Sequence, residues 1–159
     1  MCRELEFQIE EIREKDGLFV DRDIPASFFQ EAMEPGNHVK KVHLKAAFSV
    51  GTDSILAEGS INAELELLCA RCGEQFETRF NEDFSETYEF CESTINLRNI
   101  IYDILALSAG IQSLCSDACR GRCPQCGANL NHETCDCLSN MPNPFAAIRV
   151  LGNKEKRDA

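Results

Sequence analysis

The sequence predicts an α+β fold: an antiparallel β-meander or partial barrel covered by one or two helices, with a cysteine-rich zinc-binding segment near the C-terminus. Three observations predict it. Apolar and polar residues alternate through much of the first half of the chain, which is the period of strands with one wet face. Residues 96–110 switch to helical spacing, and five of the ten cysteines fall within residues 119–137.

The alternating segments predict the strands. The clearest strand is residues 42–50, in which every second side chain is apolar. A second long strand is expected over residues 55–69, because the Gly-Thr-Asp between the two suits a tight connection. Three further strands are predicted at residues 5–9, about 75–80 and about 84–90.

Three helices are expected around this sheet. Residues 21–33 are predicted to form a short helix. Residues 96–110 are predicted to form the main helix, with Asn96 as its cap and Gly110 as its stop, and this helix is expected to cover the apolar face of the sheet. Residues 143–151 predict a last short helix with a proline in its first turn.

The organisation that follows is one sheet domain with small additions. We expect residues 1–114 to form the sheet and its covering helices, and residues 115–140 to form a metal-binding module packed on it. We expect residues 141–151 to contain the short helix and residues 152–159 to be a disordered tail.

Composition and charge narrow the function. The chain has 159 residues, 43% of them hydrophobic, which is enough for a core, and its formal net charge is −11. An acidic chain opposes contact with phosphates, so basic proteins are the more natural partners. We find no signal peptide and no membrane-spanning run, and therefore expect a cytoplasmic protein whose thiols stay reduced. Reduced cysteines in this number favour metal binding over disulfides.

Two segments have the form of a zinc knuckle. Residues 69–73 read Cys-Ala-Arg-Cys-Gly and residues 123–127 read Cys-Pro-Gln-Cys-Gly. Two residues between cysteines let both sulfurs face one point from a tight turn, and the glycine that follows takes a backbone conformation that other residues resist. Each knuckle therefore supplies half of a tetrahedral thiolate site.

Eight cysteines are candidate ligands, enough for two four-thiolate sites: Cys69, Cys72, Cys115, Cys119, Cys123, Cys126, Cys135 and Cys137. One partition groups residues 123, 126, 135 and 137 and leaves the other four together. Another joins the two knuckles, as in a zinc ribbon. We favour the first slightly, because one of its groups closes locally at lower entropic cost. A single site that uses only some of these cysteines stays open.

Other chemistry of the cysteines is less favoured. An iron–sulfur cluster also takes four thiolates, so only the knuckle form speaks against it. A thioredoxin-like motif needs a helix directly after the cysteine pair, and neither knuckle is followed by a convincing one. Cys2 and Cys91 lie outside the pattern and are expected to be ordinary buried thiols. His132 is a conceivable substitute ligand, although an exposed histidine is the commoner case.

Charged residues suggest contacts with partners or with the metal sites. Arg71, Arg120 and Arg122 lie in or beside the cysteine loops and are expected to offset thiolate charge, with phosphate contact as the alternative.

A basic cluster on one strand is either a solvated edge or a contact for RNA or another partner: Lys40, Lys41, His43 and Lys45. Between residues 64 and 92, nine acidic residues face two arginines. A solvated sheet face is the favoured interpretation, and a docking surface for a basic partner that includes Glu64, Glu66 and Glu77 is the alternative.

The motifs from residue 60 onward resemble the YceD family of large ribosomal RNA subunit accumulation proteins. The resemblance rests on Cys-Ala-Arg-Cys after an alternating strand, an apolar helix, then CSDACRGRCPQCGANLNHETCDC and a closing NPFAAIRVL. Gly73 and Arg122 depart from the family pattern, which usually has leucine at both, and neither is expected to touch a proposed ligand.

The resemblance implies a non-catalytic role in the synthesis, processing or stability of 23S ribosomal RNA, in a family often encoded beside a small protein of the same ribosomal subunit. The implied partner is a precursor of the large subunit, through a basic ribosomal protein or through 23S rRNA. One or two structural zinc ions are expected as cofactor. No catalytic motif, membrane contact or small-molecule substrate is expected.

Two other functions stay open. A zinc-ribbon nucleic-acid binder acting in transcription or RNA metabolism would bind RNA or DNA with a steep dependence on salt. A thiol oxidoreductase would have an unusually acidic cysteine and would turn over a dithiol.

Overall fold

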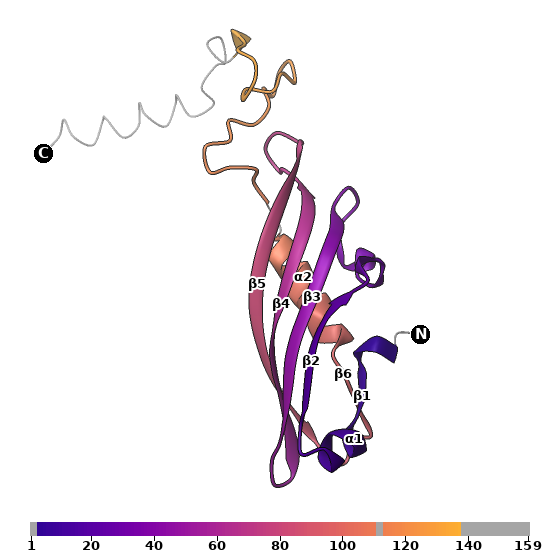
Figure 1. The fold of residues 1–159 in the computed structure, drawn as a ribbon. Coiled ribbons are helices and arrows are strands. Elements are labelled where there is room, and N and C mark those ends of the chain that lie inside the picture. The colour runs from indigo at the N-terminus through magenta and orange to yellow at the C-terminus, as the bar shows by residue number, and fades with distance from the viewer. Residues whose placement is uncertain (1–2, 111–112, 138–159) are drawn as a thin grey trace, which may run out of the picture.

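A long, curved antiparallel sheet forms the body of the protein, and one helix lies across its inner face (Figure 1). The computed structural model describes residues 3–110 and 113–137. The sheet has the order β2-β3-β4-β5, and within the described residues it stays open, with β2 and β5 as its two edges. This confirms the predicted α+β class with a meander.

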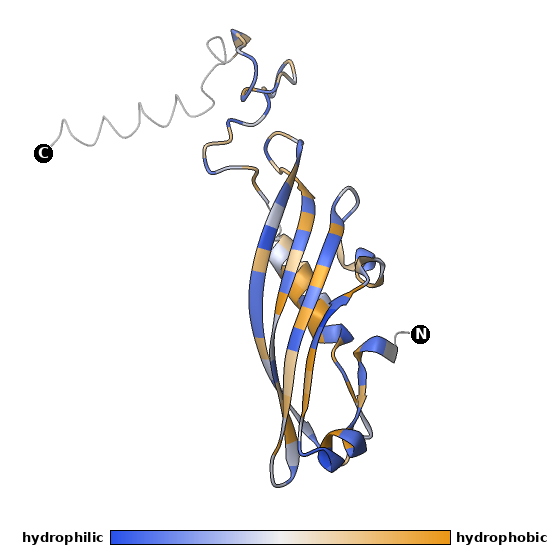
Figure 2. Cartoon of the chain, in the orientation of Figure 1, coloured by the Kyte–Doolittle hydropathy of each residue, from blue (hydrophilic) through white to orange (hydrophobic). Residues whose placement is uncertain are grey.

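Three consecutive long strands make most of this sheet. They are β3 (His38–Val50), β4 (Ser54–Leu68) and β5 (Gln75–Glu89), and the shorter β2 (Leu18–Ile24) pairs with β3. From Val42 to Phe48 on β3, and from Ile55 to Leu67 on β4 except at Gly59, every second residue is buried, as the alternation in the sequence predicts; an irregularity between Val39 and Lys41 shifts the pattern at the start of β3. Figure 2 shows the same alternation as hydrophilic and hydrophobic bands along the strands.

The predicted separation of residues 75–80 from 84–90 is wrong, because both belong to the continuous strand β5. The polar triplet Asn81-Glu82-Asp83 continues the ladder without a break, with Asn81 opposite Asn62 and Asp83 opposite Ser60. Asn81 and Asp83 lie on the solvent face of the strand, where polar residues carry no cost, and Glu82 lies on the helix side but is exposed at the sheet edge, so the triplet does not mark a turn.

The predicted helix over residues 21–33 is also wrong. Residues up to Ile24 pair with β3 as part of β2, and Pro25 follows directly. The rest of the segment forms two single 3-10 turns, η2 (Ala26–Phe28) and η3 (Gln30–Ala32). The long-range pairing of β2 with β3 overrides the local helical pattern.

Short elements close one end of the sheet. The N-terminal segment contains η1 (Arg3–Leu5), β1 (Glu6–Gln8) and α1 (Ile9–Glu14), where the sequence predicted a strand over residues 5–9. Strand β1 pairs with β6 (Thr94–Asn96) in a separate two-stranded sheet. This pairing brings the start of the chain to the start of the main helix.

The main helix, α2 (Arg98–Ala109), covers the inner face of the large sheet as predicted. The side chain of Asn96 accepts a hydrogen bond from the Arg98 N–H (2.9 Å), and Gly110 ends the helix. Ile101 and Leu105 are fully buried against the sheet, and burial of each such side chain contributes about 1.5–3 kcal/mol. None of the described helices is long and apolar enough to cross a membrane.

One glycine allows the centre of the sheet to pack. Gly59 on β4 lies opposite Ala46 on β3 and Phe84 on β5. A Cβ atom on Gly59 would come within 2.1 Å of the Lys45 carbonyl oxygen and 2.9 Å of the Phe84 ring. The absence of a side chain therefore leaves room for the Phe84 ring.

Candidate metal centres

The first cysteine cluster lies where the tip of the β4–β5 hairpin meets the chain after α2. Cys69 directly follows β4, and Cys72 lies in the turn before β5. Cys115 and Cys119 come from the segment that follows α2, and the Ser113 carbonyl accepts a hydrogen bond from the Ala70 N–H (2.8 Å). Two parts of the chain that are far apart in sequence therefore supply two cysteines each.

The geometry of this cluster fits one tetrahedral ion. All four Sγ atoms lie within 4.8 Å of one another. The Sγ atoms of Cys69 and Cys119 are 3.7 Å apart, and those of Cys72 and Cys115 are 3.8 Å apart. A tetrahedron with metal–sulfur bonds of about 2.3 Å has S···S edges of about 3.8 Å. These separations far exceed a disulfide bond of about 2.05 Å.

The second cluster contains Cys123, Cys126, Cys135 and Cys137, whose Sγ atoms also lie within 4.8 Å of one another. This grouping is the partition that the sequence analysis favoured slightly, and the zinc-ribbon pairing of the two knuckles does not occur. The second cluster is the more exposed of the two: Cys126 is exposed, whereas Cys69, Cys72 and Cys119 in the first are buried.

The two knuckles share one backbone pattern. The Gly73 N–H donates to the Cys69 carbonyl (2.8 Å), and the Gly127 N–H donates to the Cys123 carbonyl (2.9 Å). In addition, the N–H of the first cysteine in each knuckle donates to the carbonyl five residues later: Cys69 to Glu74, and Cys123 to Ala128. Both glycines have a positive φ, 70° and 75°, which explains why glycine follows each cysteine pair.

Backbone groups promote ionisation of the leading cysteine in each knuckle. Burial opposes ionisation of Cys69, but hydrogen bonds from backbone N–H groups, including that of Cys115, outweigh it and lower the Cys69 pKa to about 6. The backbone N–H groups of Cys126 and Gln125 likewise lower the pKa of Cys123 to about 6. These two thiols are ready to act as thiolate ligands near neutral pH.

Two of the other thiols have raised pKa values. The thiol of Cys115 has its pKa raised to about 12, first by its hydrogen bond with Cys119 and then by burial. The pKa of Cys137 rises to about 11, first through its hydrogen bond with Cys126. Thiolates crowded together repel one another, so a cation at the centre of each cluster is what would allow all four to ionise.

Arginine and asparagine side chains hold the two cysteine segments together. Arg71 donates to the Cys119 carbonyl (3.1 Å), and Arg122 donates through Nε to the Cys72 carbonyl. Asn131 donates to the Cys119 sulfur (3.4 Å) and accepts from the backbone N–H of Arg120. Asn131 was not among the predicted site residues, although its place between the second knuckle and Cys135 was a usable signal.

The expectation that neither Arg122 nor Gly73 touches a candidate ligand residue is wrong for both, because the Gly73 N–H donates to the Cys69 carbonyl. Arg122 contacts a candidate ligand residue through its carbonyl, and a Cβ on Gly73 would lie 3.6 Å from the Arg122 Nε. The two positions are therefore neighbours in space. Arg71 and Arg122 both bond to carbonyl oxygens of the cysteine residues.

The remaining sulfur and imidazole groups lie apart from the clusters. Cys91 is exposed in the turn after β5, so the prediction of a buried thiol is wrong there, and Cys2 lies outside the described residues. His132 is in neither cluster; its Nε2 lies 3.1 Å from the carboxylate of Glu74, and this contact links the second cysteine loop to the β4–β5 turn.

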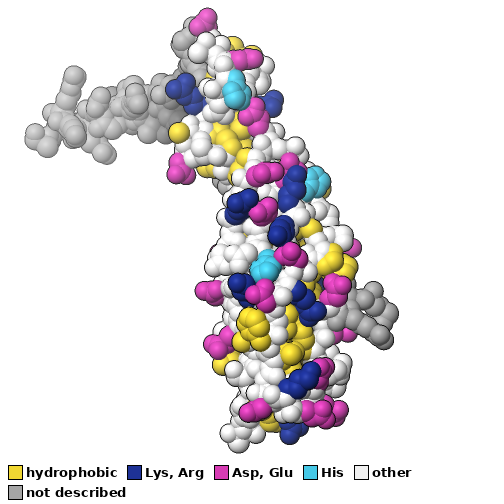
Figure 3. Space-filling model, viewed as in Figure 1, with side chains coloured by type: hydrophobic (Ala, Val, Ile, Leu, Met, Phe, Trp, Pro, Cys, Tyr) yellow, Lys and Arg dark blue, Asp and Glu magenta, His cyan; other side chains and the backbone are white. Residues whose placement is uncertain are grey.

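The charged residues of the outer sheet face pair with one another. Lys41 and Lys45 on β3 lie 3.6 and 3.7 Å from Asp23 and Asp21 on β2, and His43 contacts both aspartates. The reason is register: Asp21 stands opposite Lys45 and Asp23 stands opposite His43 in the β2–β3 ladder, and Lys41 lies two residues before His43 on the same strand. The expected basic cluster is thus flanked by acids, and Figure 3 shows both signs interspersed on this face.

Two acidic residues of the same face have partners as well. Lys40 lies 3.2 Å from Glu66, and Arg79 on β5 lies 3.0 Å from Glu64 on β4. Glu77 is exposed and stands opposite Glu66. A contact of these residues with RNA or protein stays a prediction, and their mutual pairing favours the interpretation as a solvated face.

The structure thus defines a class of small cysteine-rich protein: an antiparallel sheet with one four-cysteine cluster at the tip of its β4–β5 hairpin and a second cluster in the segment that follows. The chain belongs to the family described as large ribosomal RNA subunit accumulation protein YceD, whose model matches residues 57–152. The match begins in β4 and includes all eight clustered cysteines. This confirms the resemblance noted in the sequence.

A curated relative supports the family. The large ribosomal RNA subunit accumulation protein YCED homolog 1, chloroplastic, of Arabidopsis thaliana is 44% identical over 43 residues, which are 27% of this chain and 13% of that protein. The match therefore spans only a small part of the relative's length. No solved structure matches the chain.

Proposed function

We propose that this protein is a non-catalytic ribosome-biogenesis factor that supports the synthesis, processing or stability of 23S rRNA, and that two structural zinc ions fix its tip. The family description supports the link with large-subunit ribosomal RNA. The observation that carries the metal part is the assembly of eight cysteines into two separate sets of four.

Zinc fits these sets better than other metals. Thiolate ligands in tetrahedral geometry are typical of zinc or of iron–sulfur centres. In a cluster of two or four irons the four thiolates are divided among the iron atoms, so the cysteine sulfurs lie farther apart. Here all four Sγ atoms of each set lie within 4.8 Å of one another. Arg71, Arg122 and Asn131 would then support the ligand residues from outside.

A structural role follows from the ligand count. Four thiolates complete a tetrahedron and leave no position for a water or a substrate. Zinc bound in this way stabilises a fold, with an apparent binding free energy on the order of 10–16 kcal/mol in small zinc domains. The first site would tie the β4–β5 hairpin to the segment after α2, and residues 115–137 would form a module fixed to the sheet; residues 138–140 of the expected module lie outside the described residues.

The proposed partner is a precursor of the large ribosomal subunit, met through a basic ribosomal protein or through 23S rRNA. A net charge of −11 favours the protein over the RNA. We place this activity in the cytoplasm, where thiols stay reduced; the plant relative is chloroplastic by its name.

Depletion of the protein from its native host tests the proposal. The ratio of 23S to 16S rRNA should fall, and wild-type protein should restore it whereas a Cys72→Ser variant should not. Elemental analysis of the purified protein should give two zinc ions per chain. An unchanged 23S rRNA level would contradict the role in ribosome biogenesis. A folded, metal-free protein with paired thiols would contradict the structural zinc ions.

A further inference from the structure

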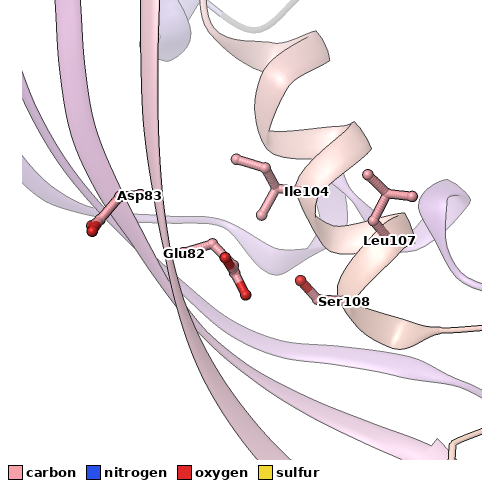
Figure 4. A pocket seen from close by; sticks show the side chains of 5 residues that line it. All are labelled: Glu82, Asp83, Ile104, Leu107 and Ser108. Carbon is pink, nitrogen blue, oxygen red and sulfur yellow. The ribbon is translucent and has the colours of Figure 1, made fainter.

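A groove with an apolar wall runs between the edge strand β5 and helix α2. It has a volume of about 250 Å³ and is lined by Glu82 and Asp83 of β5 and by Ile104, Leu107 and Ser108 of α2. Figure 4 shows Glu82 pointing from the strand toward the helix and Asp83 pointing to the other side of the strand. Leu107 is 80% exposed, the highest value among the large hydrophobic side chains described.

Strand β5 offers backbone as well as side chains to this groove. It is 15 residues long and forms one edge of the sheet, so among the described residues its outer backbone groups pair with no strand. Every second N–H and C=O of such a strand points away from the sheet. A long edge is a ready template for an added strand.

The charge of β5 selects what can be added. The strand carries five acidic residues and one arginine: Glu77, Arg79, Glu82, Asp83, Glu86 and Glu89. Glu82 and Glu86 stand opposite the buried residues Ile61 and Ala57, so they lie on the helix side of the strand. Two copies of this edge would repel each other, and a nucleic acid would be repelled for the same reason.

We propose that β5 and α2 together form a docking site for an extended, basic protein segment, which adds a strand to β5 and places an apolar side chain against Ile104 and Leu107. Lysine or arginine side chains of that segment meet Glu82 and Glu86 on the helix side and Glu77 and Asp83 on the other. The backbone pairing supplies affinity, and the acids and the apolar contact supply selectivity.

The site is joined to the first cysteine cluster. Cys72 and Glu74 lie in the turn that leads into β5, and the Cys69 N–H donates to the Glu74 carbonyl (2.9 Å). Metal bound there would hold one end of the edge strand in place. Only the identification of the partner as a component of the large-subunit precursor rests on the proposed function.

Peptide binding to the full-length, metal-loaded protein tests the site. The probe is a fluorescent peptide about twelve residues long, with lysines on both faces of an extended strand and valines at the helix-side positions meant to face Ile104 and Leu107. Its controls are a glutamate–valine peptide and a lysine–valine peptide N-methylated at every second amide, which cannot complete a ladder. We expect the first to bind, more weakly at higher salt, and both controls to fail.

Variants locate the binding. Leu107→Ser and Glu82→Lys should each weaken binding about tenfold. Leu107 is exposed, so its variant should fold normally. The matched controls are Phe19→Ser, an exposed aromatic on the opposite edge strand, and Glu58→Lys, the same charge change on the outer face of β4; both should bind as the wild type does.

Several results would overturn the proposal. Equal binding by the groove and control variants would do so, as would a concentration-dependent dimer that Leu107→Ser abolishes. Binding that appears only after deletion of residues 141–159 would make the chain's own C-terminal segment the occupant. If the peptide fails to bind while depletion still lowers 23S rRNA, the groove proposal fails alone. If the peptide binds as expected while 23S rRNA is unaffected, the proposed function fails alone.

Discussion

The Sγ atoms of Cys69 and Cys119 lie 3.7 Å apart although 50 residues separate them in the chain. Strand β5, strand β6 and helix α2 all lie between them in sequence. A metal ion at this point would close a long loop, and closing such a loop restricts the unfolded chain more than closing a short one. The second cluster spans only residues 123–137, and its contribution to the sheet should be smaller.

Because the first cluster closes a long loop and the second a short one, substituting a cysteine should destabilise the sheet more in the first cluster than in the second. Cys72→Ser and Cys126→Ser should each reduce the zinc content by one ion per chain. Cys72→Ser should lower the free energy of unfolding of the sheet by more than about 4 kcal/mol, because it removes a buried metal site. Cys126→Ser should lower it by less. Elemental analysis and urea unfolding followed by circular dichroism measure both quantities.

The control for these variants is Cys91→Ser. Cys91 is exposed and belongs to neither cluster, so zinc content and stability should not change. Equal loss of stability in Cys72→Ser and Cys126→Ser would contradict the division of roles.

The two sites should also release metal at different rates. Cys126 is exposed and Cys135 and Cys137 are half-buried, whereas three of the four cysteines in the first cluster are buried. A chelator reaches an exposed site more easily. We expect two kinetic phases of equal amplitude when zinc is released to a colorimetric chelator, and loss of the faster phase in Cys126→Ser. A single phase in the wild type would contradict this.

The pairing of His43 with Asp23 predicts a small loss of stability at acidic pH. The His43 ring lies 2.7 Å from the Asp23 carboxylate, and this hydrogen bond holds the pKa of Asp23 below its ordinary value of 3.8. Because this pKa is lower in the folded protein than in the unfolded chain, the ionised carboxylate stabilises the fold at pH values above the ordinary pKa of 3.8. The contribution is lost as the pH falls through the folded pKa. The effect is small because the pair is exposed.

A carboxyl carbon NMR titration measures this directly. The pKa of Asp23 should lie below 3.8 in the wild type and should be higher in His43→Gln than in the wild type, because the hydrogen bond with His43 is the largest cause of the lowering. An Asp23 titration that ignores the His43 substitution would refute the assignment.

A methyl group added at Gly59 should lower the free energy of unfolding strongly. A Cβ at this position meets the backbone oxygen of Lys45 at 2.1 Å and the Cα of Ala46 at 2.9 Å, and backbone cannot move aside cheaply. Gly59→Ala should lower the free energy of unfolding by about 3 kcal/mol or more. The comparison is Gly127→Ala, where no atom lies within 4 Å and only the positive φ costs, about 1–2 kcal/mol. Equal costs would show that the sheet relaxes around Gly59.

The elements that the sequence predicted well have strong local signals. Alternation located β3 and β4, because side chains of a strand point alternately to its two faces. Helical spacing between Asn96 and Gly110 located α2 almost to the residue. Where the signal was polar or mixed, the predictions failed: Asn81-Glu82-Asp83 continues a strand, and the segment around Pro25 holds strand and 3-10 turns instead of a helix.

The sequence by itself determined the chemistry of this protein: eight cysteines in two knuckles and two trailing pairs, and an acidic charge, because residue types and short spacings are local properties. Only the tertiary structure decided which cysteines share a centre, that the lysines of β3 face aspartates of β2, and that β5 is an open edge beside α2. Each of these depends on strand pairing between distant segments, whose register is set by burial of the whole sheet and is not encoded at any one position.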